Sequence, residues 1–104
     1  MQDQALQIKK DGDTLTIRIL RPFKFDMYKD FRTAYINHVW VVNHYIIDLG
    51  KVDLLDSSAL GMLMLLYKET KARNMQATVT LTNAKPQVLT LLKASNLEDI
   101  FTIA

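Results

Sequence analysis

The first hydrophobic residues of the chain alternate with polar ones, in the pattern of two short β-strands. The alternating apolar positions are Leu6, Ile8, Leu15, Ile17 and Ile19. Asp11, Gly12 and Asp13 lie between the two sets, and residues of these types favour tight turns. The pattern therefore predicts a β-hairpin at the start of the chain.

A helical pattern follows, from about Met27 to Asn37. Aromatic residues recur there at positions i, i+3 and i+7, namely Tyr28, Phe31 and Tyr35. Phe25 and Asp26 precede this run as a hydrophobic residue followed by an N-cap, which is typical of a helix start. We expect the first helix here.

Two β-prone runs follow the first helix, at Val39 to Val42 and at Tyr45 to Ile47. We place a buried strand at Tyr45 to Asp48, because a short apolar run followed by Asp-Leu-Gly is typical of a central strand that ends in a loop. The sequence leaves the conformation of Val39 to Val42 open.

The second half of the chain carries the clearest helix signals. Asp56 and Ser57 stand before strong helix formers and basic residues stand near the far end, which predicts a helix from Ser58 to Arg73. Alternation then predicts a strand at Ala77 to Thr82, and Pro86 suits the first turn of a helix that continues to Ala94. Asn96 is expected to adopt a left-handed cap. A short terminal element carries Leu97, Ile100, Phe101 and Ile103.

The order of these elements predicts an α/β fold. We expect a mixed β-sheet of about four to five strands covered by about three to four helices, with the internal strand buried on both faces. The 104 residues correspond to a single domain, 1–104.

Composition and charge exclude several classes of function. The net charge of +2 comes from 13 basic and 11 acidic residues mixed along the chain, so no basic patch predicts nucleic-acid binding. The absence of cysteine excludes disulfides, a thiolate nucleophile and cysteine-bound zinc, and no leader-like segment is visible, which favours the cytoplasm. The longest apolar stretch, Ala59 to Tyr67, is shorter than the roughly 20 residues that span a bilayer, so we expect no membrane insertion.

The residues that could support catalysis or ligation are few. His38 and His44 have no carboxylates at ligand spacing, and no glycine-rich phosphate loop occurs. The loop carboxylates Asp48, Asp53 and Asp56 are interpreted as cap and turn residues rather than a metal site. No recognisable base is placed to activate Ser57 or Ser58. We therefore expect no enzyme activity, no cofactor and no metal.

The helix at Ser58 to Arg73 is apolar almost all the way round, which is more than the stripe needed for packing on a sheet. Periodicity favours burial of Leu60, Leu63, Leu66 and Tyr67. Ala59, Met62 and Leu65 are then candidates for a protein-docking surface, and burial between neighbouring helices is the alternative.

The corner formed by Asp56, Ser57 and Ser58 is a helix cap by its residue types. A hydroxyl at this point is also well placed to carry a phosphate, because free helix N–H groups and the positive end of the helix dipole tolerate a negative charge.

Residues 46–63 resemble the signature of the STAS domain, and more narrowly that of bacterial anti-sigma factor antagonists. The shared pattern is an apolar strand, Asp48-Leu49, a short loop and the run Asp-Ser-Ser at 56–58. Ala59 stands where the family usually has Gly, Phe23-Lys24 replaces a common Gly-Glu, and Lys85 stands where Ser often precedes Pro86.

The resemblance implies that Ser57 accepts a phosphate from a serine kinase that also acts as an anti-sigma factor, and that a PP2C-type phosphatase removes it. It places Gly61 at a close-packed position of the helix. The partner-binding residues expected on this basis and from the helix pattern are Asp26, Asp56, Ser58, Ala59, Met62 and Leu65. The alternative is an accessory STAS subunit that docks on the ATPase of a transporter without a phosphorylation cycle.

Overall fold

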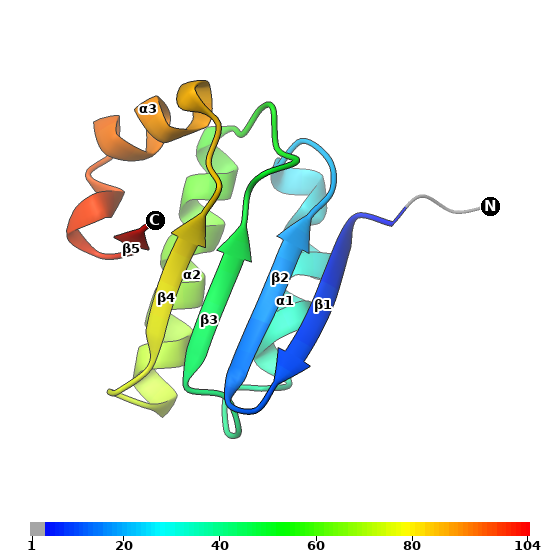
Figure 1. Ribbon diagram of the computed structural model, residues 1–104, viewed down its shortest axis with the longest axis vertical. Coiled ribbons are helices and arrows are strands. Elements are labelled where there is room, and N and C mark those ends of the chain that lie inside the picture. Colours follow the sequence, from blue (N-terminus) through cyan, green and yellow to red (C-terminus); the bar gives the residue numbers. More distant parts are fainter. Residues whose placement is uncertain (1–3) are drawn as a thin grey trace.

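The structure is a computed structural model that describes residues 4–104 (Figure 1). The strands are β1 (Leu6–Asp11), β2 (Thr14–Ile19), β3 (His44–Asp48), β4 (Thr78–Thr82) and β5 (Thr102–Ile103). The helices are α1 (Tyr28–Ile36), α2 (Ser57–Arg73) and α3 (Pro86–Ala94), with single 3-10 turns η1 (Phe25–Met27) and η2 (Leu97–Asp99).

The strands form one five-stranded sheet in the order β1-β2-β3-β4-β5. Only β1 runs antiparallel to its neighbour, and the other pairs are parallel. The helices α1 and α2 lie side by side behind the sheet in Figure 1, which confirms the predicted mixed α/β architecture. Within residues 4–104, no helix combines the length and apolarity needed to cross a bilayer.

The predicted local elements are confirmed with small shifts of their ends. Gly12 has a φ of +63° in the hairpin turn, a conformation that glycine adopts without a steric penalty. Asn96 adopts the expected left-handed conformation, with φ 60° and ψ 24°. The first helix, predicted at Met27 to Asn37, is shorter by one residue at each end, because Met27 belongs to the 3-10 turn η1 and Asn37 is the C-cap of α1.

The segment at 39–42, which the sequence left open, forms turns between α1 and β3. The N–H groups of Val41 and Val42 both donate to the carbonyl of His38 at 3.0 Å. Val39 and Val42 are buried while Trp40 is exposed. The β-prone residues here therefore anchor a loop to the core instead of adding a strand.

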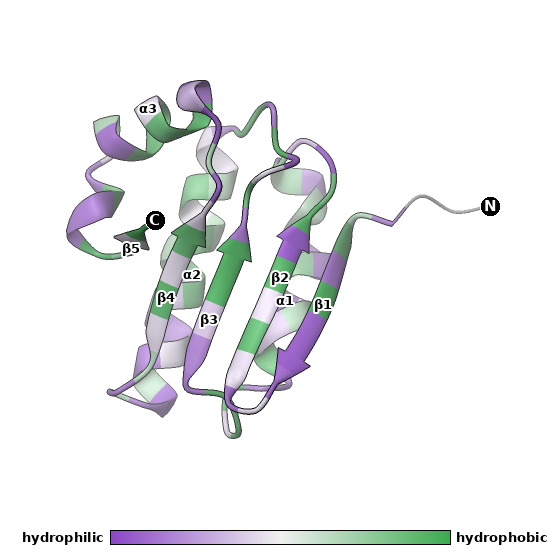
Figure 2. Ribbon diagram, in the orientation of Figure 1, coloured by the Kyte–Doolittle hydropathy of each residue, from purple (hydrophilic) through white to green (hydrophobic). Residues whose placement is uncertain are grey.

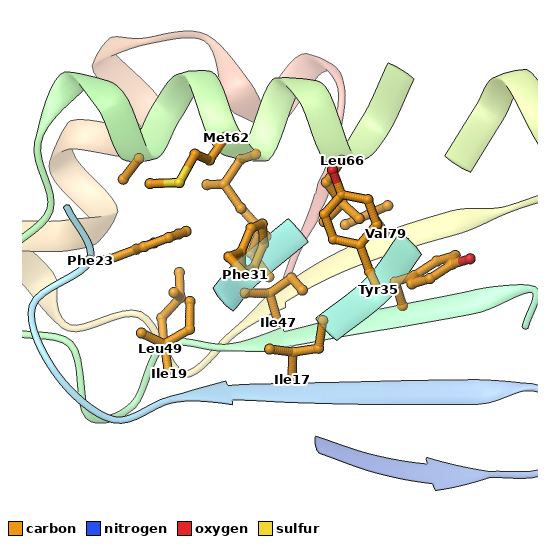
Figure 3. Packing of buried hydrophobic residues seen from close by; sticks show 14 of the residues in the cluster. Ile17, Ile19, Phe23, Phe31, Tyr35, Ile47, Leu49, Met62, Leu66 and Val79 are labelled. Atoms are coloured by element: carbon orange, nitrogen blue, oxygen red, sulfur yellow. The ribbon is translucent and has the colours of Figure 1, made fainter. Parts of the chain in front are cut away.

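The core lies between the sheet and the two helices behind it (Figure 3). Alternate residues of the three central strands are buried on this side, namely Leu15, Ile17, Ile19, Tyr45, Ile47, Val79 and Leu81. The rings of Phe23, Phe31 and Tyr35 fill the space under α2, with ring centroids 5.0 Å and 5.6 Å apart along the series. Apolar burial of this kind is the main stabilising contribution in a small domain.

The opposite face of the sheet is open, so the prediction that the internal strand is buried on both faces is wrong. Along β3, His44 is exposed and Ile46 and Asp48 are only half-buried. The neighbouring open-face positions Thr16 and Thr80 are also half-buried. Figure 2 shows polar residues alternating with apolar ones along β2 and β4, as expected for a sheet with one solvated face.

A polar cluster joins α1 to α2. Arg32 donates two hydrogen bonds to the Glu69 carboxylate, at 3.1 Å from Nε and 2.6 Å from Nη2, and the Tyr35 hydroxyl donates to the same carboxylate at 2.5 Å. The hydrogen bond from Arg32 holds the pKa of Glu69 below its ordinary value. Burial, together with the bond to Glu69, raises the pKa of Tyr35.

This cluster makes part of the stability dependent on pH. Because folding lowers the pKa of Glu69, its charged carboxylate stabilises the folded state at pH values above the unfolded pKa of about 4.3. This stabilisation is lost as the pH falls through the lower pKa of the folded state. We expect Glu69→Gln to be less stable than the natural chain at pH 7, with a smaller difference near pH 3. Urea unfolding at both pH values measures this, and an equal difference at both would contradict the assignment.

Candidate functional site

The site begins at the first turn of α2. Asp56 is the N-cap, and its Oδ1 accepts a hydrogen bond of 2.9 Å from the N–H of Ala59. Ser57 is the first residue of the helix and is exposed, and Ser58 is half-buried. The first N–H groups of a helix have no partner inside it and carry the positive end of the helix dipole. The Ser57 hydroxyl therefore lies at a point that tolerates negative charge.

Backbone contacts from the chain before α1 hold this turn in place. The N–H of Phe23 donates to the carbonyl of Leu54 at 2.9 Å, and the N–H of Asp56 donates to the carbonyl of Phe23 at 3.3 Å. Asp53 forms an ion pair with Lys85 at the start of α3. Three segments far apart in the sequence thus converge on the start of α2.

An apolar groove of about 220 Å³ lies beside Ser57, between η1, α1 and α2. Its lining residues are Phe25, Tyr28, Ser58, Gly61, Met62 and Leu65. The rings of Phe25 and Tyr28 stack with an interplanar angle of 6° and a centroid separation of 6.2 Å. Phe25 is 67% exposed, which is unusual for a ring of this size.

Gly61 lines this groove at an exposed position of α2. A Cβ atom added there would meet nothing within 4 Å. The close-packed position that the resemblance implies for Gly61 is therefore not found within the described chain. Glycine inside a helix is less favourable than alanine by roughly 0.5–1 kcal/mol, and no contact within the described residues explains its presence.

The structure brings most of the predicted site residues to this corner. Ser58, Met62 and Leu65 line the groove, although only 5% of Met62 is exposed. Ala59, expected on the partner-binding surface, lies in the core instead and is 0% exposed. The third residue of α2 turns toward the core, so the side chain of Ala59 is not available to a partner. Asp26 is exposed within η1.

The helix pattern predicted the burial along α2 only in part. Leu63 and Leu66 are fully buried as expected, whereas Leu60 and Tyr67 are only half-buried. Tyr67 instead makes an edge-to-face contact with Phe101, with ring centroids 5.8 Å apart.

Sequence reasoning missed the aromatic wall of the groove. The sequence pattern gives Phe25 only as the residue before the helix and Tyr28 only as part of its aromatic spacing, and both rings are exposed beside α2. A signal was available in the spacing of the two rings, because residues three apart on a helical turn lie on the same side.

The three loop carboxylates and His44 have partners within the protein. Asp48 accepts hydrogen bonds from the Gly50 N–H at 2.9 Å and from Asn83 at 3.1 Å. His44 shares a hydrogen bond of 2.8 Å with the Thr78 hydroxyl. Among residues 4–104, no three His, Asp or Glu side chains gather in a way that could hold a metal ion.

Comparison with known proteins decides the family. Residues 5–104 match the STAS domain. This chain belongs to the STAS domain family. A STAS-domain containing protein of Pseudomonas aeruginosa (strain UCBPP-PA14) is 42% identical to it over 94 residues, which cover 90% of this chain and 91% of the relative.

Solved structures share the fold of this STAS domain. TM1081 of Thermotoga maritima, a proposed anti-sigma factor antagonist, is similar with a TM-score of 0.82 and 18% identity, over 94% of this chain and 84% of that protein. The Bacillus cell fate determinant SpoIIAA in its phosphorylated form is similar with a TM-score of 0.74 and 19% identity, over 96% of this chain and 91% of SpoIIAA. The unphosphorylated form of SpoIIAA is similar with a TM-score of 0.75 and 16% identity, over 96% of this chain and 87% of SpoIIAA.

Proposed function

We propose that this STAS domain is a phosphorylation-switched protein-binding regulator of the anti-sigma factor antagonist type, acting in a bacterial partner-switching pathway. Ser57 is the phospho-acceptor, and its phosphate controls docking to a serine kinase of the anti-sigma factor type. A PP2C-type phosphatase reverses the modification. The proposal locates this cycle in the cytoplasm.

One observation carries the proposal: an exposed hydroxyl at the start of a helix lies directly beside an apolar groove. Ser57 is exposed, and Ser58, the next residue, lines the groove together with Met62 and Leu65. An apolar groove with exposed aromatic walls is a typical surface for binding another protein. The solved forms of SpoIIAA, a protein of the same fold, include a phosphorylated one, which supports this kind of control.

The physical effect of the phosphate follows from its charge. Phosphorylation adds about −1.5 to −2 charges at pH 7, and the whole chain carries a formal charge of only +2. At the start of α2 the dipole and the free N–H groups accept this charge, so the fold is expected to persist. A partner that covers the adjoining groove would have to desolvate the phosphate, which costs binding energy unless the partner supplies basic groups.

Gly61 supports docking by a closely approaching partner. Because nothing in the described chain lies within 4 Å of an added Cβ, the lack of a side chain at Gly61 keeps the middle of the groove open. A partner segment could then contact the α2 backbone directly. This use of glycine, for close approach of another backbone, explains a residue that weakens its own helix.

We expect Gly61→Ala to stabilise the isolated domain by roughly 0.5–1 kcal/mol, because alanine is the better helix former. The same change should weaken partner binding, since the added methyl group occupies the groove. Urea unfolding and calorimetric titration with the partner measure the two effects. Ala72→Gly, at another exposed position of α2, is the matched control: it should lower stability and leave binding unchanged. A Gly61→Ala variant that binds as well as the natural chain would contradict the role of Gly61.

The function is tested by isolating the protein from its native cells and locating any phosphate by mass spectrometry. The proposal expects a phosphate on Ser57 and capture of a serine kinase by the unphosphorylated form. Phosphate on another residue only would refute the switch assignment. Capture of a transporter ATPase by unmodified protein, unaffected by Ser57→Asp, would instead establish the accessory-subunit function.

A further inference from the structure

Strand β1 forms one edge of the sheet, and within residues 4–104 its only neighbouring strand is β2. The pairing with β2 runs without interruption over all six residues of β1, and the strand contains no proline. Regular edge strands of this kind expose a row of backbone hydrogen-bonding groups that can pair with another strand. In Figure 1, β1 lies along the right-hand margin of the sheet with no element covering that side.

The pairing pattern shows which backbone groups of β1 point outward. The carbonyl of Ala5 accepts a hydrogen bond of 2.9 Å from the N–H of Leu20, so the backbone polar groups of Ala5 point toward the chain of β2. Residues along an antiparallel strand alternate between facing the partner and facing away. The N–H and carbonyl groups of Leu6, Ile8 and Lys10 therefore point away from the sheet.

The side chains of Leu6 and Ile8 border a groove that stays open to solvent. Ile8 is 48% exposed. A groove of about 270 Å³ lies between β1 and α1, lined in part by Leu6, Ile8, Asp30 and Thr33. Because side chains alternate along a strand, Lys10 lies on the same face of the sheet as Leu6 and Ile8.

We propose that β1 pairs with β1 of a second copy of this chain in an antiparallel, two-fold symmetric dimer. The register that uses the outward-facing groups along the strand places Ile8 opposite Ile8 of the second copy. Leu6 then lies opposite Lys10 of the second copy, and Gln7 opposite its Lys9. The pairing would create one continuous sheet from two five-stranded sheets and would cover the β1 edge of each copy, leaving β5 at both ends.

Charge complementarity is the argument for a second copy over another strand. Lys10 of one copy, placed opposite Leu6 of the other, comes beside the groove that contains Asp30 of that other copy. Symmetry produces this lysine–aspartate contact twice, and no like charges lie directly opposite each other in this register. Lysines on an edge strand normally discourage strand pairing. In this register, however, Asp30 of the other copy lies where it can form an ion pair with Lys10. Within residues 4–104, the Lys10 Nζ donates a hydrogen bond of 3.0 Å to the carbonyl of Gly12.

The dimer would leave the docking groove accessible. Asp30 and Tyr28 are two residues apart on α1, so they point about 200° apart around the helix axis. Tyr28 lines the groove beside α2, and Asp30 lines the groove beside β1. Each dimer would thus present two separate docking grooves.

Sedimentation equilibrium of the full chain tests the proposal with a charge-swap series. The natural chain should show a concentration-dependent monomer–dimer equilibrium. Lys10→Glu and Asp30→Lys should each weaken dimerisation about tenfold or more, because each brings like charges together. The double variant Lys10→Glu/Asp30→Lys should recover it. A chain that stays monomeric at millimolar concentration, or single variants that dimerise as the natural chain does, would overturn the proposal.

Amide hydrogen exchange locates the interface. The outward N–H groups of Leu6, Ile8 and Lys10 should become protected as the concentration rises. The N–H groups of Gln7 and Lys9, which face β2, should be protected at every concentration. If the outward N–H groups became protected only after a different protein was added, the partner of β1 would be a strand of that protein and not a second copy. If their protection did not change with concentration, pairing between copies at this edge would be excluded.

Discussion

Ser57→Asp is expected to weaken binding to the kinase-type partner by about 3 kcal/mol, or roughly a hundredfold in Kd, because a buried charge without a counter-charge costs several kcal/mol. The added carboxylate lies next to Asp56, and the partner would have to cover it while covering the groove. Asp53 adds little to this repulsion, since Lys85 is paired with it. The melting temperature should stay nearly unchanged, because a negative charge at a helix start is favourable.

Two substitutions at the same position separate charge from shape. Ser57→Asn has nearly the shape of the Asp variant without its charge, so it should bind far better than Ser57→Asp. Ser57→Ala should bind constitutively because it cannot be phosphorylated. Calorimetric titration with the partner and thermal unfolding of each variant measure these effects. Equal binding by the Asp variant and the natural chain would rule out control through this residue.

Leu63→Ala is expected to destabilise the domain by about 2–5 kcal/mol, as truncation of a buried leucine does. Leu63 is 0% exposed and packs between α2 and the sheet. Since small domains are stable by only about 5–15 kcal/mol in total, this loss should be plain in urea unfolding.

Leu65→Ala is the matched comparison, because Leu65 lies two residues further along the same helix and lines the groove. Its replacement should cost less stability than that of Leu63 and should reduce partner binding. If the two variants were equally destabilised, the division of α2 into a core side and a docking side would be wrong.

The local elements of this protein were predictable from the sequence because their signals are local. Alternation over Leu15, Ile17 and Ile19 marks β2, and these residues are fully buried. Asp56 before a run of helix formers marks the start of α2, and its side chain caps that helix. The cap signal indicated only that a hydroxyl at this corner could carry a phosphate; the resemblance to the STAS signature singled out Ser57, and its phosphorylation stays a prediction.

The arrangement of these elements around the site depended on contacts between distant parts of the chain. The groove needs Phe25 and Tyr28 to stand beside Met62 and Leu65, more than thirty residues away. No periodicity within one helix indicates which of its apolar residues will meet a second helix and which will stay accessible. Ala59 is an example, because a small residue next to the cap could face either side until the neighbouring segment is placed.

The sequence by itself determined where most of the strands and helices lie, which side of β2 is apolar, and that hydroxyl groups stand at the start of α2. These features depend on residues close together in the chain. Only the tertiary structure decided that one face of the sheet is open, that exposed aromatic rings form a groove beside Ser57, and that Glu69 joins α1 to α2 through Arg32. Such features arise when segments far apart in sequence pack together, because packing fixes which of several chemically equivalent surfaces is buried and which stays accessible to a partner.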